Sequence, residues 1–157
     1  MKIIGMIPAR LGSTRVKNKN LRLINGIPLI QYVINAAKDS KLLDEIYINS
    51  EAEIFDQIAE NNSLQFYKRP AQLASNEATN DDFALDFMSN INGDLLIQLL
   101  PTSPFITTKE IDGFIQSMLD GSYQTMISVS NVQIECMFDN KALNFNQKEQ
   151  TPPSQLL

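Results

Sequence analysis

The sequence contains no histidine and only one cysteine, Cys136. Without histidine, Ser-His-Asp triads, histidine general bases and histidine metal ligands are all excluded, so a metal site would have to use oxygen ligands. A single cysteine cannot form an internal disulfide, and this favours a reducing cytoplasm as the location of the protein. The function must therefore rest on chemistry that needs neither residue.

Long hydrophobic runs are also missing. No apolar stretch approaches the roughly 20 residues needed to cross a bilayer, and the N-terminus lacks the apolar core and cleavage site of a signal peptide. The net charge of −5 argues against nucleic acid and membrane as partners, because both favour broadly positive surfaces. Since no repeat or linker divides the chain, we predict a single domain over residues 1–157.

Negative charge is absent from the first quarter of the chain. Residues 1–38 contain seven Lys and Arg and no Asp or Glu, and five of the seven lie within residues 10–22. This basic segment directly follows an apolar run at residues 3–7 that is typical of a buried strand. Such a cluster is either a solvated surface loop or an anion site. Because it follows the first strand, we predict a site for a polyanion of the size of a nucleoside triphosphate.

The rest of the chain alternates short apolar runs with amphipathic segments. Strands are predicted at residues 3–7, 46–49, 64–67, 95–100 and 125–129, and the nearly all-apolar 95–100 is expected to be central. Helical spacing occupies residues 28–38, 50–59, 79–91 and 107–121, and the last three begin with capping-box patterns. Asn25-Gly26 indicates a tight turn. Together these patterns predict an α/β fold with a mainly parallel sheet.

Three unusual loops, at residues 8–20, 68–80 and 101–107, each follow a predicted strand directly. In a parallel sheet the carboxyl ends of the strands share one edge, where ligands bind, so the loops are expected to meet there. The first loop matches neither the P-loop nor the dinucleotide fingerprint. It nevertheless offers Gly12, backbone amides and the cations Arg10, Arg15 and Lys19 to an anion.

The loops also carry a family resemblance. Ala9-Arg-Leu-Gly-Ser-Thr-Arg with Lys19-Asn-Leu, Arg69-Pro-Ala-Gln-Leu-Ala, and Pro101-Thr-Ser-Pro occur in order over most of residues 3–130. These motifs resemble the sugar-acid cytidylyltransferases, in particular N-acylneuraminate cytidylyltransferase and its pseudaminate and legionaminate relatives. The first motif also resembles the CMP-Kdo synthetases.

This resemblance implies a Rossmann-like nucleotidyltransferase fold with three α/β/α layers, and an enzyme that uses CTP and Mg²⁺. The anomeric hydroxyl of a 2-keto sugar acid of sialic, pseudaminic or legionaminic type would attack the α-phosphorus, and pyrophosphate would leave. Such transfer depends on positioning and charge stabilisation, so no nucleophilic cysteine or histidine is needed. The resemblance further implies a cytoplasmic enzyme of cell-surface polysaccharide biosynthesis that forms a homodimer at full length.

Roles are carried over by position within these motifs. Arg10 and Lys19 would be catalytic, because they would hold the triphosphate and offset charge on the leaving pyrophosphate. The residues implied in nucleotide binding are Ala9, Arg10, Leu11, Gly12, Ser13, Arg15, Lys19, Asn20, Arg69, Ala78 and Asn80. Those implied in binding the acceptor are Gln98, Thr102 and Ser103. Gln98 enters as a substitute, since the sialic branch usually has Gln where Leu100 stands, two residues later on the same strand face.

The family is substantially longer than this chain, and its C-terminal part supplies acceptor contacts, a dimerisation element and acidic metal ligands. Residues 151–157 resemble the segment just before that part, so the chain looks cut short and its metal ligands stay unassigned. Asp81 and Asp82 fit helix N-terminal carboxylates better than metal ligands. Two alternatives stay open: a CMP-Kdo-type or other sugar nucleotidyltransferase, and a nucleotide-binding fragment without catalysis.

Overall fold

The computed structural model describes residues 1–13, 15–130 and 136–144. The chain divides into two units, Met1–Ser122 and Tyr123–Leu157. The prediction of a single domain over residues 1–157 stays a prediction.

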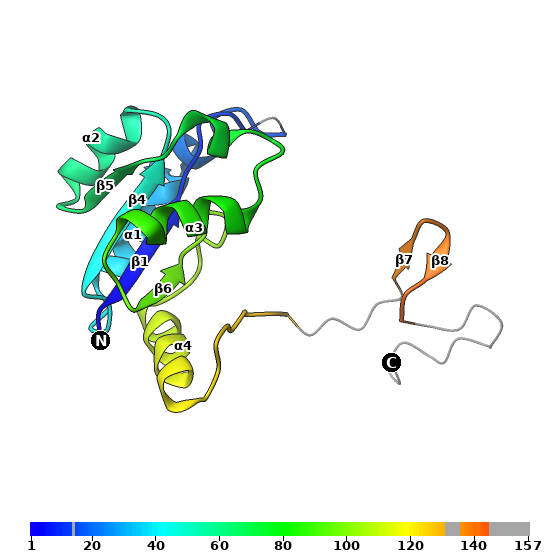
Figure 1. Cartoon of the computed structure of the whole chain (residues 1–157). Coiled ribbons are helices and arrows are strands. Elements are labelled where there is room, and N and C mark those ends of the chain that lie inside the picture. Colours follow the sequence, from blue (N-terminus) through cyan, green and yellow to red (C-terminus); the bar gives the residue numbers. More distant parts are fainter. Residues whose placement is uncertain (14, 131–135, 145–157) are drawn as a thin grey trace. The chain divides into compact units, whose positions relative to one another are not determined.

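The first unit is built on a parallel sheet with the strand order β5-β4-β1-β6 (Figure 1). Its elements are, in chain order, β1 (Ile3–Pro8), η1 (Lys19–Leu21), β2 (Leu23–Ile24), β3 (Ile27–Pro28), α1 (Leu29–Lys38), β4 (Glu45–Ser50), α2 (Ile54–Asn61), β5 (Gln65–Lys68), η2 (Ala71–Ala74), α3 (Asn80–Asn90), β6 (Leu95–Gln98) and α4 (Thr108–Asp120). The predicted α/β fold with a mainly parallel sheet is confirmed.

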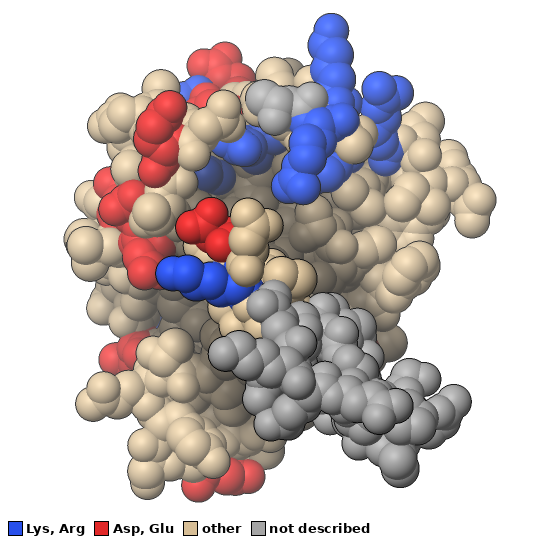
Figure 2. All heavy atoms as spheres, turned by 90° about the vertical axis from the view of Figure 1, so that its right-hand side faces the viewer, with Lys and Arg blue, Asp and Glu red and all other residues tan. Residues whose placement is uncertain are grey.

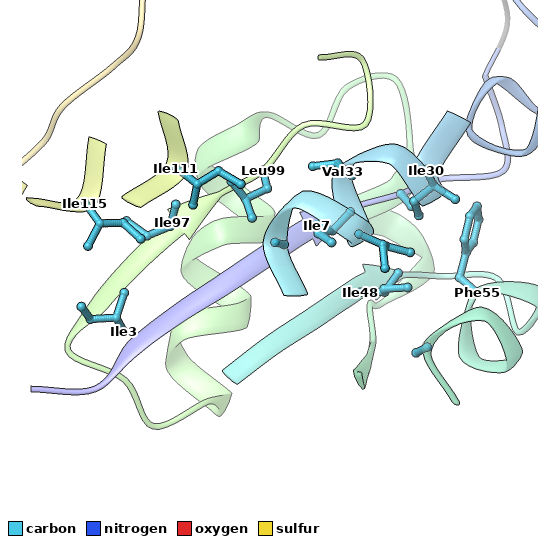
Figure 3. Packing of buried hydrophobic residues seen from close by; sticks show 14 residues of the cluster. Ile3, Ile7, Ile30, Val33, Ile48, Phe55, Ile97, Leu99, Ile111 and Ile115 are labelled. Atoms are coloured by element: carbon cyan, nitrogen blue, oxygen red, sulfur yellow. The ribbon is translucent and has the colours of Figure 1, made fainter. Parts of the chain in front are cut away.

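Helices cover both faces of this sheet. Because side chains alternate along a strand, Ile3 and Ile7 of β1 face a core shared with α1, α2 and α4, whereas Ile4 and Met6 face α3. Figure 3 shows Ile7 and Ile48 of neighbouring strands packed with the buried side chains of α1. The three layers implied by the resemblance are therefore present.

Two strand predictions are wrong. β6 was expected to be central, but it lies at the edge of the described sheet. Its apolar run reflects burial of both faces, since Ile97 packs into one core and Leu96 against the other. Residues 125–129 form no strand, and Ile127 and Val129 are 75% and 78% exposed. An apolar segment becomes a strand only where a neighbour accepts its backbone hydrogen bonds.

The capping predictions have mixed outcomes. Thr79 with Asp82 and Thr107 with Glu110 form complete capping boxes at α3 and α4. Asp82 therefore caps α3. The hydrogen bond from the Thr79 backbone, and to a lesser extent the one from its side chain, lowers the pKa of Asp82. The predicted box at Ser50 is wrong, because the buried Ser50 hydroxyl instead accepts the Ala52 amide at 3.2 Å.

Short hairpins account for the remaining strands. β2 and β3 are joined by the predicted Asn25-Gly26 turn, in which both residues have positive φ. In the second unit β7 (Met137–Phe138) and β8 (Lys141–Ala142) form an antiparallel pair around Asp139 and Asn140. Residues 151–157, which entered the family resemblance, lie outside the described residues. Across the described ranges, no helix is long and apolar enough to cross a membrane.

Candidate functional site

A pocket of about 550 Å³ opens in the first unit where β1 and β6 end. Its volume falls within the range typical of small-molecule sites. β1 connects onward to β4 on one side while β6 lies on the other, so the strand order reverses between them, as at ligand sites of other open α/β sheets. The lining residues are Pro8, Arg10, Ser13, Arg15, Val16, Lys19, Asn20, Arg69, Phe83, Leu100, Pro101 and Thr102. The three unusual loops thus meet, as predicted.

Strand periodicity explains which side chains reach this pocket. Met6 of β1 packs beneath α3, and Arg10 emerges four residues later on the same side of the sheet. Tyr67 of β5 also packs beneath α3, and Arg69 follows two residues later. Phe83, in the first turns of α3, lines the pocket itself. The pocket therefore continues the α3-facing side of the sheet beyond the point where α3 covers it.

Positive charge dominates the lining. Arg10, Arg15, Lys19 and Arg69 all contribute, whereas among the residues that the structure describes no Asp or Glu lines the pocket. The ion pairs found between described residues involve neither Arg15 nor Lys19. Figure 2 shows a face of the molecule on which several Lys and Arg side chains gather on one side. Cations that converge on a pocket whose described lining includes no carboxylate favour an anionic ligand.

Arg10 links two of the loops. Its Nη1 donates to the carbonyl oxygens of Ala74 (3.2 Å) and Ser75 (2.9 Å) and to Oδ1 of Asn76 (3.1 Å). Its Nε and Nη2 make no hydrogen bond to the described residues, so one edge of the guanidinium remains for an anion. The sequence analysis predicted that Arg10 binds the triphosphate, but it did not predict the hydrogen bonds from Arg10 to residues 74–76.

Arg69 is almost fully buried, with 4% of its surface exposed. Its Nε donates to Oδ1 of Asn49 at 2.7 Å and its Nη2 to the Asn49 carbonyl at 2.6 Å. The guanidinium lies 4.7 Å from the centre of the Phe83 ring, a cation–π contact. Burial lowers the pKa of Arg69 and nearby Glu51 opposes that shift, but guanidinium stays charged in proteins. Arg69 therefore contributes a fixed positive charge to the lining of the pocket.

The basic loop is anchored at its start. The buried side chain of Asn20 donates from Nδ2 to the Arg10 carbonyl at 3.2 Å. The Leu11 amide donates to Oε1 of Glu51 at 2.8 Å. The amides of this loop were predicted to assist in anion binding, and the Leu11 amide is already engaged. Glu51 was missed because the segment after β4 was interpreted as a helix cap. Its place one residue beyond a strand was the signal that could have found it.

Several residues with predicted roles lie outside the lining, and those roles stay predictions. Leu100 lines the pocket, whereas Gln98, its suggested substitute on the same strand face, does not. The Ala78 amide donates to the Ser75 hydroxyl at 3.2 Å, within the loop that Arg10 holds. The predicted residues that the lining does not include are Ala9, Leu11, Gly12, Ala78, Asn80, Gln98 and Ser103. Val16 and Phe83 line the pocket without having been predicted.

A magnesium site was implied by the family resemblance. Within the described ranges, no group of three or more His, Cys, Asp and Glu is placed to hold a metal. Since hard cations such as Mg²⁺ prefer carboxylate and other oxygen ligands, these residues do not by themselves fit that ion.

Comparison with curated proteins gives sequence relatives over most of the chain. It is 34% identical over 133 residues to an N-acylneuraminate cytidylyltransferase of Escherichia coli, covering 82% of this chain and 31% of that protein. This chain is 33% identical over 135 residues to a 3-deoxy-manno-octulosonate cytidylyltransferase of Bdellovibrio bacteriovorus. The match covers 83% of this chain and 51% of that protein. The chain therefore spans about a third to a half of the length of these relatives.

Solved structures share the fold. A CMP:2-keto-3-deoxy-manno-octonic acid synthetase in complex with CTP matches with a TM-score of 0.68 and 24% identity, covering 76% of this chain and 48% of that one. A cytidylyltransferase of Leptospira borgpetersenii matches with a TM-score of 0.64 and 22% identity, covering 78% of this chain and 50% of that one. The family model described as cytidylyltransferase matches residues 4–151. This chain therefore belongs to the cytidylyltransferase family.

Proposed function

We propose that the protein to which this chain belongs transfers CMP from CTP to a 2-keto sugar acid and releases pyrophosphate. The observation that carries the proposal is the convergence of Lys19, Arg15 and the free edge of Arg10 on one pocket at the carboxyl ends of β1 and β6. The relatives named above, which act on N-acylneuraminate and on 3-deoxy-manno-octulosonate, support this class of acceptor.

In the proposed reaction, the anomeric hydroxyl oxygen of the sugar acid forms a bond to the α-phosphorus of CTP, and the hydroxyl proton is released to water. The bond from that phosphorus to the pyrophosphate oxygen breaks, and negative charge builds up on the leaving group. Arg10 and Lys19 offset this charge, which is the main contribution a protein makes to such transfers. Arg69 and Phe83 border the nucleoside. Mg²⁺ stays a prediction, and no step is routed through it.

The test measures binding and turnover separately. Binding of CTP, UTP, GTP and ATP is compared by isothermal titration calorimetry, with CTP expected to bind most tightly. Pyrophosphate release is then followed with CTP and N-acylneuraminate in the presence of Mg²⁺. Equal affinity for all four nucleotides would contradict the assignment to CTP.

A second acceptor class has its own support. The identities to the N-acylneuraminate and 3-deoxy-manno-octulosonate enzymes differ by a single percentage point, 34% against 33%. We therefore propose a panel of N-acylneuraminate, pseudaminate, legionaminate and 3-deoxy-manno-octulosonate as acceptors. The acceptor with the highest kcat/KM identifies the branch to which the protein belongs.

A nucleotide-binding role without catalysis is the alternative for the 157 residues taken alone. It is favoured by the limited coverage of the relatives, 31% and 51% of their lengths. Formation of a CMP-sugar by the 157-residue chain itself would remove this alternative. A cytoplasmic location and a homodimer of the full-length protein remain part of the proposal.

A further inference from the structure

Glu51 directly follows β4 and contacts the start of the basic loop. β1 and β4 pair in parallel with Pro8 opposite Asn49, and the Ala9 amide extends the ladder to the Asn49 carbonyl at 2.9 Å. Continuing this register past both strands brings Glu51 opposite Arg10, so that the Glu51 carboxylate reaches the amide of the next residue, Leu11. The two residues are 40 positions apart in sequence, so only the sheet brings them together.

The carboxylate of Glu51 is held by one short hydrogen bond, and its second oxygen lies near the strand end. Its Oε1 accepts the Leu11 amide at 2.8 Å, and its Oε2 lies 3.4 Å from the hydroxyl of the fully buried Ser50. Ser50 is fixed in turn by the Ala52 amide. Hydrogen bonds to an ionised acceptor are roughly twice as strong as neutral ones. The contact therefore anchors the loop to a rigid strand end.

The charge of Glu51 also suits this position. Arg10 and Arg69 lie close enough to repel each other, and of the charges that act on Arg69, Glu51 is the leading one that stabilises its cation. Glu51 itself is not among the residues that line the pocket. Glu51 can thus stabilise the charge of Arg69 without occupying the pocket in which an anionic ligand would meet the cations.

We propose that Glu51 is a positioning residue for nucleotide binding, acting through the Leu11 amide to hold the loop that carries Arg10 and Lys19. This inference rests on the proposed function. Because its hydrogen is donated to Glu51, the Leu11 amide is not available to a triphosphate in this arrangement.

The test compares three variants of the 157-residue chain by calorimetry with CTP. Glu51→Ala is expected to weaken binding about tenfold, the factor that a lost charge-assisted hydrogen bond carries. Glu51→Gln, which keeps an acceptor oxygen, is expected to bind within about threefold of the unchanged chain. Glu60→Ala, at an exposed position of α2, removes the same charge elsewhere and is expected to have no effect.

Amide hydrogen exchange at Leu11, followed by NMR, reports on the contact without nucleotide. Exchange is expected to accelerate at least about tenfold in Glu51→Ala and to stay slow in Glu51→Gln. Nucleotide binding by Glu51→Ala as tight as that of the unchanged chain would overturn the inference alone. Equal losses of CTP affinity in Glu51→Ala and Glu51→Gln would also overturn it, because the charge of Glu51 rather than its hydrogen bond to Leu11 would then be responsible. Failure of the unchanged chain to bind CTP would overturn the proposed function as well.

Discussion

Lys19 is the pocket cation that is best suited to separate ligand binding from folding. Its side chain makes no ion pair with the described residues, and η1 is held by backbone hydrogen bonds. Lys19→Ala is therefore expected to weaken CTP binding about 10- to 100-fold with little change in the free energy of unfolding. Lys17→Ala, outside this pocket, is the matched control. Unchanged affinity in Lys19→Ala would contradict a triphosphate site.

Arg69 is the opposite case, because the same side chain serves the pocket and the fold. Replacement by Lys removes the planar pair of bonds to Asn49 and leaves buried acceptors unpaired. Arg69→Lys is expected to lower the free energy of unfolding by about 1–3 kcal/mol, measured by urea denaturation. Lys68→Arg, at the exposed neighbouring position, is expected to be neutral. A stable Arg69→Lys protein would show that the network is dispensable.

At the scale of the element, α3 depends on its first turn. The Thr79 hydroxyl accepts the Asp82 amide at 3.2 Å, and the Asp82 carboxylate accepts the Thr79 amide at 2.8 Å. Thr79→Ala is expected to cost about 1 kcal/mol of unfolding free energy, whereas Thr79→Ser retains the cap. Thermal denaturation of the two variants checks this, and equal melting temperatures would count against the capping box. Because Phe83 lies in the same helix, CTP affinity is expected to fall with the cap.

The contact between α3 and the sheet is expected to weaken at alkaline pH. Tyr47 and Tyr67 meet the Phe87 ring edge-on at 5.3 and 5.1 Å. Burial, assisted by hydrogen bonds to Glu45 and Asp86, raises the pKa of each phenol to about 12. The protonated form is thus favoured by folding, so this stabilisation is complete below about pH 10 and is lost as the pH rises towards about 12.

Denaturant unfolding at intervals between pH 9 and 12 measures this dependence. The unchanged protein is expected to lose stability with rising pH more steeply than the double variant Tyr47→Phe, Tyr67→Phe, which has no phenol to ionise at these positions. Parallel curves for the two proteins would show that other groups account for the alkaline loss.

At the scale of the whole molecule, one face of the sheet relies on few side chains. Phe87, Ile4 and Met6 are the fully buried members of the α3 core. Phe87→Ala is expected to cost about 3–5 kcal/mol, a large share of the stability of a typical domain. Leu85→Ala, in the same helix at a position that is 71% exposed, is the control. Urea denaturation of both checks the prediction, and a similar small loss in each would contradict it.

Sequence patterns predicted the elements where local rules and burial agree. The apolar run at residues 3–7, the helical stripe of α1 and the capping boxes of α3 and α4 all depend on neighbours within a few positions. The strand at residues 95–100 was predicted correctly, but its central position and the strand at residues 125–129 were wrong, because strand order and strand pairing depend on distant partners. An apolar run reports that a segment is suited to burial, but it does not say which strand lies beside it.

The α/β class, the family motifs and the asymmetry of charge can all be read from the sequence, because they follow from residue types, periodicity and order along the chain. How the cations are used depends on contacts that form only in the fold. Parallel pairing of β4 with β1 and β5 brings the Glu51 carboxylate to the Leu11 amide and Asn49 to Arg69, and loop packing lets Arg10 hold residues 74–76. These contacts join residues 20 to 66 positions apart. Their formation depends on how strands pair, which no single segment specifies.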